Sequence, residues 1–203
     1  MCGIVSYIGK KDPVPILLKG LRRLEYRGYD SAGVALLNSE KLQSIKKVGK
    51  VSVLESLIDD SPINGYCGIA HTRWATHGEP NDVNAHPHID QTKKIALVHN
   101  GIIENYDSIK EVLKKRGVSF TSSTDSEVLV QLISELYYNN NENLSFEDAV
   151  RAALQEVIGA YGIVVICEDE PGKIIAARMG SPLVLGVGDG EFLIASDASP
   201  IIE

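Results

Sequence analysis

Apolar and polar residues follow two different periods along this chain, and the switch between them predicts its secondary structure. Short apolar runs bounded by turn residues are typical of strands, which we expect at 2–9, 31–37, 41–48, 66–74, 93–99, 161–167, 173–178, 183–187 and 192–196. Apolar residues that recur every three or four positions indicate amphipathic helices at about 13–24, 51–58, 106–116, 124–136 and 146–158. Because groups of strands stand between groups of helices, we expect sheets covered by helices rather than a βαβ alternation.

Polar and glycine residues mark the ends of these elements. Residues 124–127 (Thr-Asp-Ser-Glu) match a capping box, Gly117 suits a helix C-cap, and residues 188–190 suit a hairpin turn. Taken alone, the Asn-Gly pair at 100–101 is typical of a type I′ turn after the strand that ends at 99. The Pro- and His-rich stretch 76–91 is expected to be an irregular surface loop that carries function.

Composition limits the possible classes of protein. The chain has 203 residues, 44% of them hydrophobic and 23% charged, which is ordinary for a globular protein with one sizeable core. A net charge of −7 without a basic stripe argues against a nucleic-acid surface. No apolar run reaches the roughly 18 residues of a membrane span, and no signal peptide is recognisable, so the cytoplasm is expected. Three cysteines without metal or disulfide spacing are expected to be free thiols.

The second residue carries the most informative chemistry. Cys is small enough to allow removal of Met1, and the processed chain would then begin with Cys2, which bears both a thiol and a free α-amine. Such an amine titrates at about 7.7 to 8.0 and can accept a proton near neutrality. A nucleophile that uses its own amino terminus as the base is one route to covalent catalysis. The alternative is a buried cysteine near an ordinary N-terminus.

Four segments are too chemically specific for a core. They are Cys-Gly-Ile at 2–4, Glu-Tyr-Arg-Gly-Tyr-Asp-Ser-Ala-Gly at 25–33, His-Thr-Arg-Trp-Ala-Thr-His-Gly at 71–78 and His-Asn-Gly-Ile-Ile-Glu-Asn at 99–105. In this order they resemble the class II (N-terminal-nucleophile) glutamine amidotransferases. Within that class, the resemblance is to the glutaminase domain of glutamine–fructose-6-phosphate aminotransferase, and it covers residues 2–203. The resemblance implies a four-layer α/β/β/α sandwich of the N-terminal-nucleophile hydrolase type.

The resemblance also implies roles for the reacting groups. Cys2 would attack the side-chain amide of L-glutamine and form a γ-glutamyl thioester, while its α-amine moves the protons. Asn100 and Gly101 would supply the donors of an oxyanion hole, one from a side chain and one from the backbone. A turn would be a natural way to present both donors. Arg27 would support the N-terminal strand or the nucleophile.

Further residues are implied to hold the substrate. Arg73 would bind the α-carboxylate of glutamine, for which its planar guanidinium is suited. Asp125 would bind the α-ammonium, although an acidic residue in the first turn of a helix also stabilises the helix dipole. Thr76 and His77 would line the same end of the site, and Trp74 would act as a mobile lid.

No metal and no cofactor are expected. The histidines at 71, 77, 86, 88 and 99 match no structural zinc pattern, and hydrogen-bonded core and loop positions are the preferred interpretation.

The expected activity is hydrolysis of glutamine to glutamate and ammonia. In the complete family enzyme, expected to be a homodimer, the ammonia converts fructose 6-phosphate to glucosamine 6-phosphate on further domains. This chain has no room for those domains and resembles an excised N-terminal domain. Two alternatives remain: the glutaminase domain of amidophosphoribosyltransferase or asparagine synthetase, and a non-catalytic amino-acid-binding regulatory domain.

Overall fold

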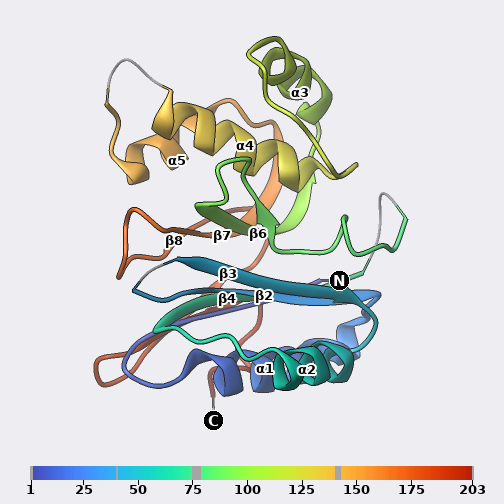
Figure 1. Ribbon diagram of the computed structural model, residues 1–203, viewed down its shortest axis with the longest axis vertical. Coiled ribbons are helices and arrows are strands. Elements are labelled where there is room, and N and C mark those ends of the chain that lie inside the picture. Colours follow the sequence, from blue (N-terminus) through green and yellow to red (C-terminus); the bar gives the residue numbers. More distant parts are fainter. Residues whose placement is uncertain (1, 40, 75–78, 140–142, 203) are drawn as a thin grey trace.

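Two antiparallel sheets lie face to face between two layers of helices. The computed structural model describes residues 2–39, 41–74, 79–139 and 143–202. Within them a six-stranded and a four-stranded sheet form the inner layers, and helices cover the outer face of each (Figure 1). The four-layer α/β/β/α sandwich expected from the resemblance is therefore confirmed.

The six-stranded sheet has the order β3-β2-β4-β1-β10-β9, which places the first strand of the chain in its interior. Its outer face is covered by α1 (Pro13–Leu24) and α2 (Val51–Asp60) (Figure 1). A 3-10 turn, Glu25–Arg27, follows α1. The strands are β1 (Gly3–Ile8), β2 (Ser31–Leu37), β3 (Leu42–Val48), β4 (Cys67–Arg73), β9 (Val184–Val187) and β10 (Phe192–Ala195).

The four-stranded sheet has the order β5-β6-β7-β8. Helices α4 (Asp125–Tyr138) and α5 (Phe146–Gln155) pack on its outer face, and α3 (Tyr106–Lys115) packs against α4. The strands are β5 (His88–Ile89), β6 (Ile95–Ile103), β7 (Gly159–Cys167) and β8 (Ile175–Met179). No described helix is both long enough and apolar enough to cross a membrane.

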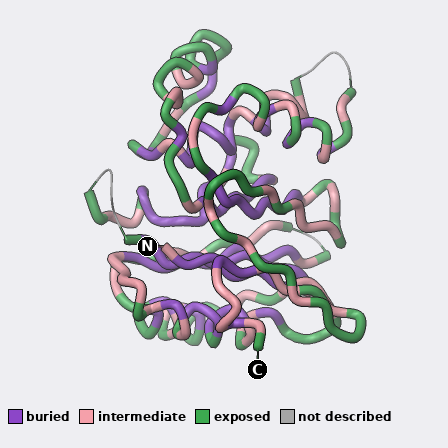
Figure 2. The backbone as a smooth tube through the Cα atoms, turned by 180° about the vertical axis from the view of Figure 1, so that it is seen from behind, coloured by how far each residue is buried: buried purple, intermediate pink, exposed green. Residues whose placement is uncertain are grey.

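Alternating side chains of each inner strand build separate cores. In β1, Ile4 packs between the two sheets, whereas Val5 and Tyr7 face the layer of α1 and α2. In β6, Ala96 and Val98 face the other sheet. Successive side chains of a strand point to opposite faces, so a strand buried on both faces reads as a continuous apolar run. Buried backbone accordingly runs through the inner layers in Figure 2.

One local prediction is wrong. Asn100 and Gly101 form no turn, because β6 continues through them to Ile103, and they pair with Gly162 and Tyr161 of β7. Gly101 has a φ of 133°, and a β-carbon there would lie 2.0 Å from the carbonyl oxygen of Ala160. Glycine is thus needed for a close approach of two strands, not for a reversal of the chain.

The described part of the predicted loop, residues 79–91, is also less exposed than expected. Ala85, His86 and His88 are buried, and His88 begins the short strand β5, which pairs with β6. The predicted site residues Thr76 and His77 lie outside the described residues. The histidine-rich part of this segment therefore belongs to the interior.

The predicted helix ends are largely confirmed. Thr124 caps α4, its hydroxyl accepting from the N–H of Glu127 at 3.3 Å. Glu127 does not close the reciprocal bond of a capping box; its carboxylate accepts from the backbone N–H groups of Thr121 and Ser122 instead. Gly117 follows α3 with a φ of 89°, as a residue beyond a C-cap requires.

Candidate active site

Strand pairing carries Cys2 to the end of β4. Gly3 of β1 pairs with Thr72 of β4, so Cys2, one residue earlier, lies beside the residues that leave β4. The N–H of Trp74 donates to the Cys2 sulfur at 3.3 Å, and the thiol donates to the Trp74 carbonyl at 3.6 Å. The start of the described chain lies at the level where the two sheets meet (Figures 1 and 2). The fold therefore places this thiol at the junction of the sheets.

The three thiols differ in their surroundings. Partial burial raises the pKa of Cys2, while the Trp74 N–H and the nearby Arg73 charge act in the opposite direction. Cys67 is fully buried between the sheets, and burial raises its pKa to about 12. Burial likewise raises the pKa of Cys167, which is fully buried under α4 and α5. Cys2 is partly exposed, unlike Cys67 and Cys167, and it lines two cavities.

Asn100 approaches Cys2 from the opposite sheet. Its side-chain nitrogen donates to the carbonyl oxygen of Cys2 at 3.2 Å. Its side-chain oxygen lies 2.9 Å from Nε2 of His71 on β4. The amide is therefore held at both ends, directly beside the residue that carries the thiol.

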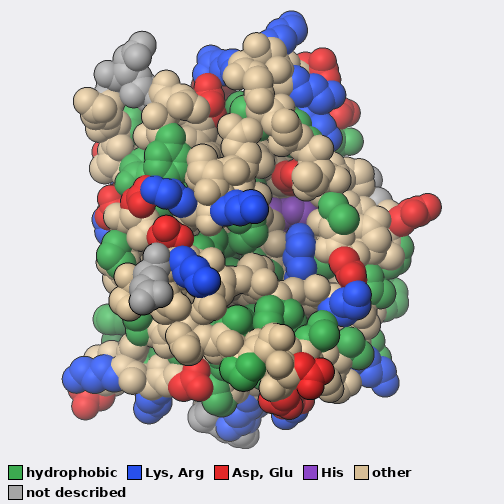
Figure 3. Space-filling model, in the orientation of Figure 1, with side chains coloured by type: hydrophobic (Ala, Val, Ile, Leu, Met, Phe, Trp, Pro, Cys, Tyr) green, Lys and Arg blue, Asp and Glu red, His purple; other side chains and the backbone are tan. Residues whose placement is uncertain are grey.

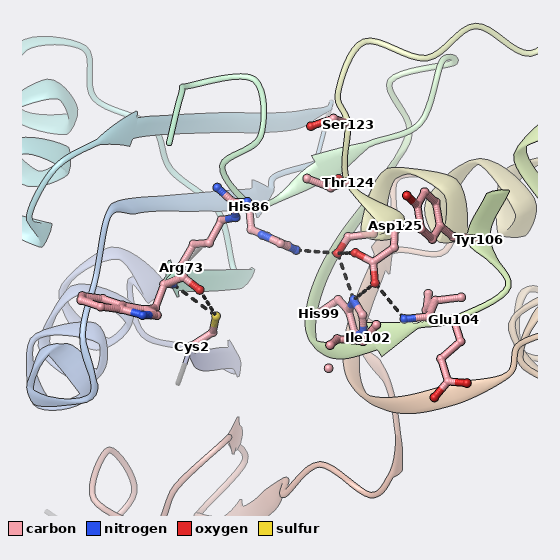
Figure 4. A pocket seen from close by; sticks show the side chains of 14 residues that line it. Cys2, Arg73, His86, His99, Ile102, Glu104, Tyr106, Ser123, Thr124 and Asp125 are labelled. Carbon is pink, nitrogen blue, oxygen red and sulfur yellow. Dashed lines mark hydrogen bonds and ion pairs between the residues drawn. The ribbon is translucent and has the colours of Figure 1, made fainter. Parts of the chain in front are cut away.

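A cavity of about 340 Å³ opens next to Cys2. Its walls come from Cys2, from Arg73 and Trp74, from 101–104 at the end of β6, from Tyr106, from 123–126 at the start of α4, and from His86 and His99. Figure 4 shows Cys2 and Arg73 on one side of this cavity and Asp125 on the other. The cavity thus has a thiol and groups of opposite charge on its walls.

Arg73 supplies the positive charge on the cavity wall near Cys2. Only 6% of its side chain is exposed, and Nη1 lies 3.8 Å from a carboxylate oxygen of Asp30. The Arg73 carbonyl accepts from the N–H of Asp30 at 2.6 Å, and the Ser31 hydroxyl donates to the Asp30 carboxylate at 2.8 Å. Asp30 therefore provides a negative charge beside this guanidinium, a contact that its place in the segment 25–33 did not specify.

Asp125, at the start of α4, both accepts hydrogen bonds and lines the cavity. Its carboxylate accepts from the N–H of Ile103 at 2.8 Å, which ties the helix to the end of β6. The Ser126 hydroxyl donates to the other carboxylate oxygen at 3.4 Å. Asp125 can therefore stabilise the start of α4, as its position in the first turn predicts, and also form part of the cavity wall.

Arg27 and Trp74 lie on a second cavity of about 270 Å³, which also reaches Cys2 and Asn100. Arg27 donates to the hydroxyl of Ser196 at 3.3 Å, and that hydroxyl in turn accepts from the N–H of Ile4 at 3.0 Å. Arg27 therefore contacts β1 through Ser196, close to Cys2. Trp74 is 51% exposed and lines both cavities.

A buried histidine cluster adjoins the site. His86 and His99 both lie 2.9 Å from the hydroxyl of Ser126, and His88 lies 3.0 Å from that of Thr124. Burial lowers the pKa of each of these rings, so they are neutral at neutral pH. Little of the histidine side chains is visible on the molecular face of Figure 3.

The sequence did not identify His86 and His99 as cavity residues. The hydrogen-bonded core position preferred for them is observed. Their spacing resembles no motif, and only the meeting of the loop before β5, strand β6 and helix α4 brings them together. The residue types alone offered a weak signal, since His99 lies within the segment 99–105 and His86 lies within none of the four segments.

A sandwich that holds the thiol of the second residue where its two sheets meet defines the N-terminal-nucleophile fold class. Comparison with known proteins agrees. Residues 71–203 match the glutamine amidotransferase domain family, and the chain belongs to this family. It is 58% identical over its full length to a glutamine–fructose-6-phosphate aminotransferase (isomerizing) of Bacteroides thetaiotaomicron and 57% identical to that of Chlorobaculum tepidum, covering 33% of each.

A solved structure extends the comparison. The chain superposes on a glutamine phosphoribosylpyrophosphate amidotransferase from B. subtilis with a TM-score of 0.83, at 28% identity, over 98% of this chain and 42% of that one. The sequence prediction of a glutamine amidotransferase domain is confirmed. The chain spans about a third of the length of the curated relatives it matches.

Proposed function

We propose that this chain hydrolyses the side-chain amide of L-glutamine through a thioester on Cys2. Membership of the glutamine amidotransferase domain family supports the reaction class. The single observation that carries the residue assignment is the position of the Cys2 thiol on a cavity whose opposite walls hold Arg73 and Asp125.

Cys2 acts as nucleophile and, once Met1 is removed, as its own base. The thiol proton passes to the α-amine, and the sulfur attacks the amide carbon of glutamine. The tetrahedral intermediate collapses as the departing nitrogen takes a proton and leaves as ammonia. Water then attacks the thioester, releasing glutamate and restoring the thiol. The raised pKa of the thiol makes a nearby base necessary.

Asn100 and Gly101 stabilise the oxyanion that forms on the amide oxygen. The Nδ2 group of Asn100 has two hydrogens, and its bond to the Cys2 carbonyl uses one of them. The second hydrogen and the backbone N–H of Gly101 are the donors assigned to the oxyanion. One such donor is worth about 2.7 to 4 kcal/mol in a transition state.

Arg73 and Asp125 hold the amino-acid end of glutamine. The guanidinium pairs with the α-carboxylate, and the Asp125 carboxylate pairs with the α-ammonium. Thr76 and His77 complete this end, and Trp74, which borders both cavities, covers it. Arg27 supports the nucleophile through Ser196 and β1.

The ammonia is used by a longer protein that aminates fructose 6-phosphate. Full-length identity of 58% to a glutamine–fructose-6-phosphate aminotransferase, against 28% to the phosphoribosylpyrophosphate enzyme, supports this acceptor over the alternative one. Residues 2–203 form its glutaminase domain, and the longer protein is a cytoplasmic homodimer.

Ammonia release from glutamine tests the proposal. The chain with a processed N-terminus, verified by intact mass, should release equal amounts of glutamate and ammonia. Cys2→Ala should release neither, whereas Cys67→Ala, a matched control at a fully buried thiol, should remain active after correction for its folded fraction. An active Cys2→Ala protein would rule out the assigned nucleophile, and binding of glutamine without turnover would favour an amino-acid-binding regulatory domain.

A further inference from the structure

The orientation of the Asn100 amide is decided by two partners. The carbonyl oxygen of Cys2 can only accept a hydrogen bond, so the amide group facing it at 3.2 Å must be the nitrogen. The amide oxygen is then directed to Nε2 of His71, 2.9 Å away. A rotation of the amide by 180° would place two acceptors against each other at Cys2.

His71 is restricted to one tautomer by its surroundings. Its Nε2 faces two acceptors, the side-chain oxygen of Asn100 at 2.9 Å and the carbonyl oxygen of His99 at 3.1 Å. Neither acceptor can donate, so Nε2 carries the hydrogen. The other ring nitrogen, Nδ1, is buried and has no hydrogen-bond partner among the described residues, as suits a bare lone pair. Burial lowers the pKa of His71 to about 3, so the ring stays neutral.

The His71 bond resists the same rotation from the opposite end. In a rotated amide the nitrogen would face the Nε2–H group, and two donors would meet in a partly buried place. Without His71 the amide would keep, among its contacts with described residues, only the bond to Cys2, and it could turn about that contact. The second Nδ2 hydrogen would then have no defined direction.

We propose that His71, acting within the proposed glutaminase site, is a positioning residue that fixes the Asn100 amide so that its free N–H points to the oxyanion. His71 does not touch the substrate in this proposal. Its effect is therefore on turnover, because the oxyanion exists only after the thiol has attacked.

Two variants separate the hydrogen bond from the packing of the ring. His71→Leu fills a similar space without a donor, and His71→Gln restores an N–H close to the Nε2 position. Complete loss of an oxyanion donor lowers kcat about 10²- to 10³-fold, so a misdirected donor should lower it roughly 10- to 100-fold in His71→Leu. KM should change less than about threefold, because ground-state binding is intact. His71→Gln should recover most of the lost turnover.

His88 offers a matched control. It is an equally buried histidine of the same cluster, but its hydrogen-bond partner is Thr124 rather than Asn100. His88→Leu should lower the melting temperature as His71→Leu does, with kcat per folded molecule kept. The alkylation rate of Cys2 by iodoacetamide, which requires no oxyanion hole, should be unchanged in His71→Leu. Loss of kcat and of alkylation in parallel, or an unchanged kcat in His71→Leu, would overturn the proposal.

The proposal is also testable without activity. Long-range ¹H–¹⁵N NMR of the chain should show His71 neutral, with the hydrogen on Nε2. The Asn100 side-chain NH₂ resonances should shift in His71→Leu and not in His88→Leu. A hydrogen on Nδ1 of His71 would contradict the proposal even in an active protein. If the unaltered chain does not hydrolyse glutamine, the proposed function fails, and these spectra still decide the position of the amide.

Discussion

The side-chain nitrogen of Asn100 lies 3.2 Å from the carbonyl oxygen of Cys2, although 98 positions separate the two residues. Cys2 precedes β1 of the six-stranded sheet, and Asn100 belongs to β6 of the four-stranded sheet. The bond therefore joins the two inner layers beside the thiol. Small shifts of one sheet against the other would change the relative position of the nucleophile and the proposed oxyanion donor.

A free amino terminus is expected to be required for turnover. A chain carrying a cleavable extension before Cys2 keeps the thiol but lacks the amine that would accept its proton. Glutamine hydrolysis should be undetectable before cleavage and should appear after it, in the same preparation verified by mass. Alkylation of Cys2 before cleavage serves as a control for access. Equal hydrolysis before and after cleavage would show that another group moves the proton.

Substrate-binding and oxyanion residues are expected to affect different kinetic constants. Asp125→Asn keeps an acceptor for the Ile103 N–H but removes the charge, and should raise KM for glutamine roughly 10- to 100-fold, as loss of a charge-assisted hydrogen bond does. Arg73→Lys, which loses the planar fork, should do the same. Asn100→Ala should instead lower kcat by about 10²- to 10³-fold. Steady-state kinetics measure both constants, and a change in KM alone for Asn100→Ala would remove it from the oxyanion hole.

Gly101→Ala is expected to be far more damaging than the same change at another glycine with positive φ. A β-carbon at Gly101 would lie 2.0 Å from the Ala160 carbonyl oxygen, which forces β6 away from β7. Gly117, with a φ of 89°, has no atom within 4 Å of the corresponding position, so Gly117→Ala carries only backbone strain of about 1 to 2 kcal/mol.

Denaturant unfolding and kcat should be measured for both glycine variants. Gly101→Ala should lose more stability than Gly117→Ala and also lose turnover. Similar losses of stability in the two variants would indicate that the strands can separate without cost.

Stability is expected to fall as the pH drops below about 6.5. Burial lowers the pKa of His71, His86, His88 and His99 in the folded chain, whereas in the unfolded chain each titrates near 6.5. Below pH 6.5 the unfolded state therefore binds more protons than the folded state. The free energy of unfolding is highest above pH 6.5 and falls on acidification. Each such histidine lowers the free energy of unfolding by at most about 1.4 kcal/mol per pH unit, and only between pH 6.5 and its own lower pKa in the folded chain.

Unfolding free energies between pH 7.5 and 5 measure this slope. His88→Gln should be less stable at pH 7.5 but should show a shallower slope, because one titrating ring is gone. The same slope in the variant and the unaltered chain would mean that His88 does not titrate on unfolding. Carboxylates whose pKa is lowered in the folded state, such as Asp82, lose their stabilisation only at lower pH.

The local pattern of residues determined most of the secondary structure. The predicted strand at 31–37 coincides with β2, and the predicted helix start at Pro13 coincides with the start of α1. Both were predictable because the apolar period and the capping residues depend only on neighbours within a few positions in the sequence. The quoted segments also determined the class of chemistry, because the combination of a second-residue thiol, an Asn-Gly pair and an Arg-Trp pair serves few reactions.

Tertiary structure decided where these groups meet. An Asn-Gly pair read locally predicts a turn, but pairing with β7 keeps Asn100 and Gly101 in an extended strand. A polar, histidine-rich segment read locally predicts an exposed loop, but His86 is buried, and Ser126 of α4 is its hydrogen-bond partner. Such outcomes depend on sheet order, register and the packing of layers, which join residues far apart in sequence. The sequence thus determined the reacting and substrate-binding groups proposed for the site, and the packing of the layers decided which atoms face one another and which further residues, such as His86 and His99, line the cavity.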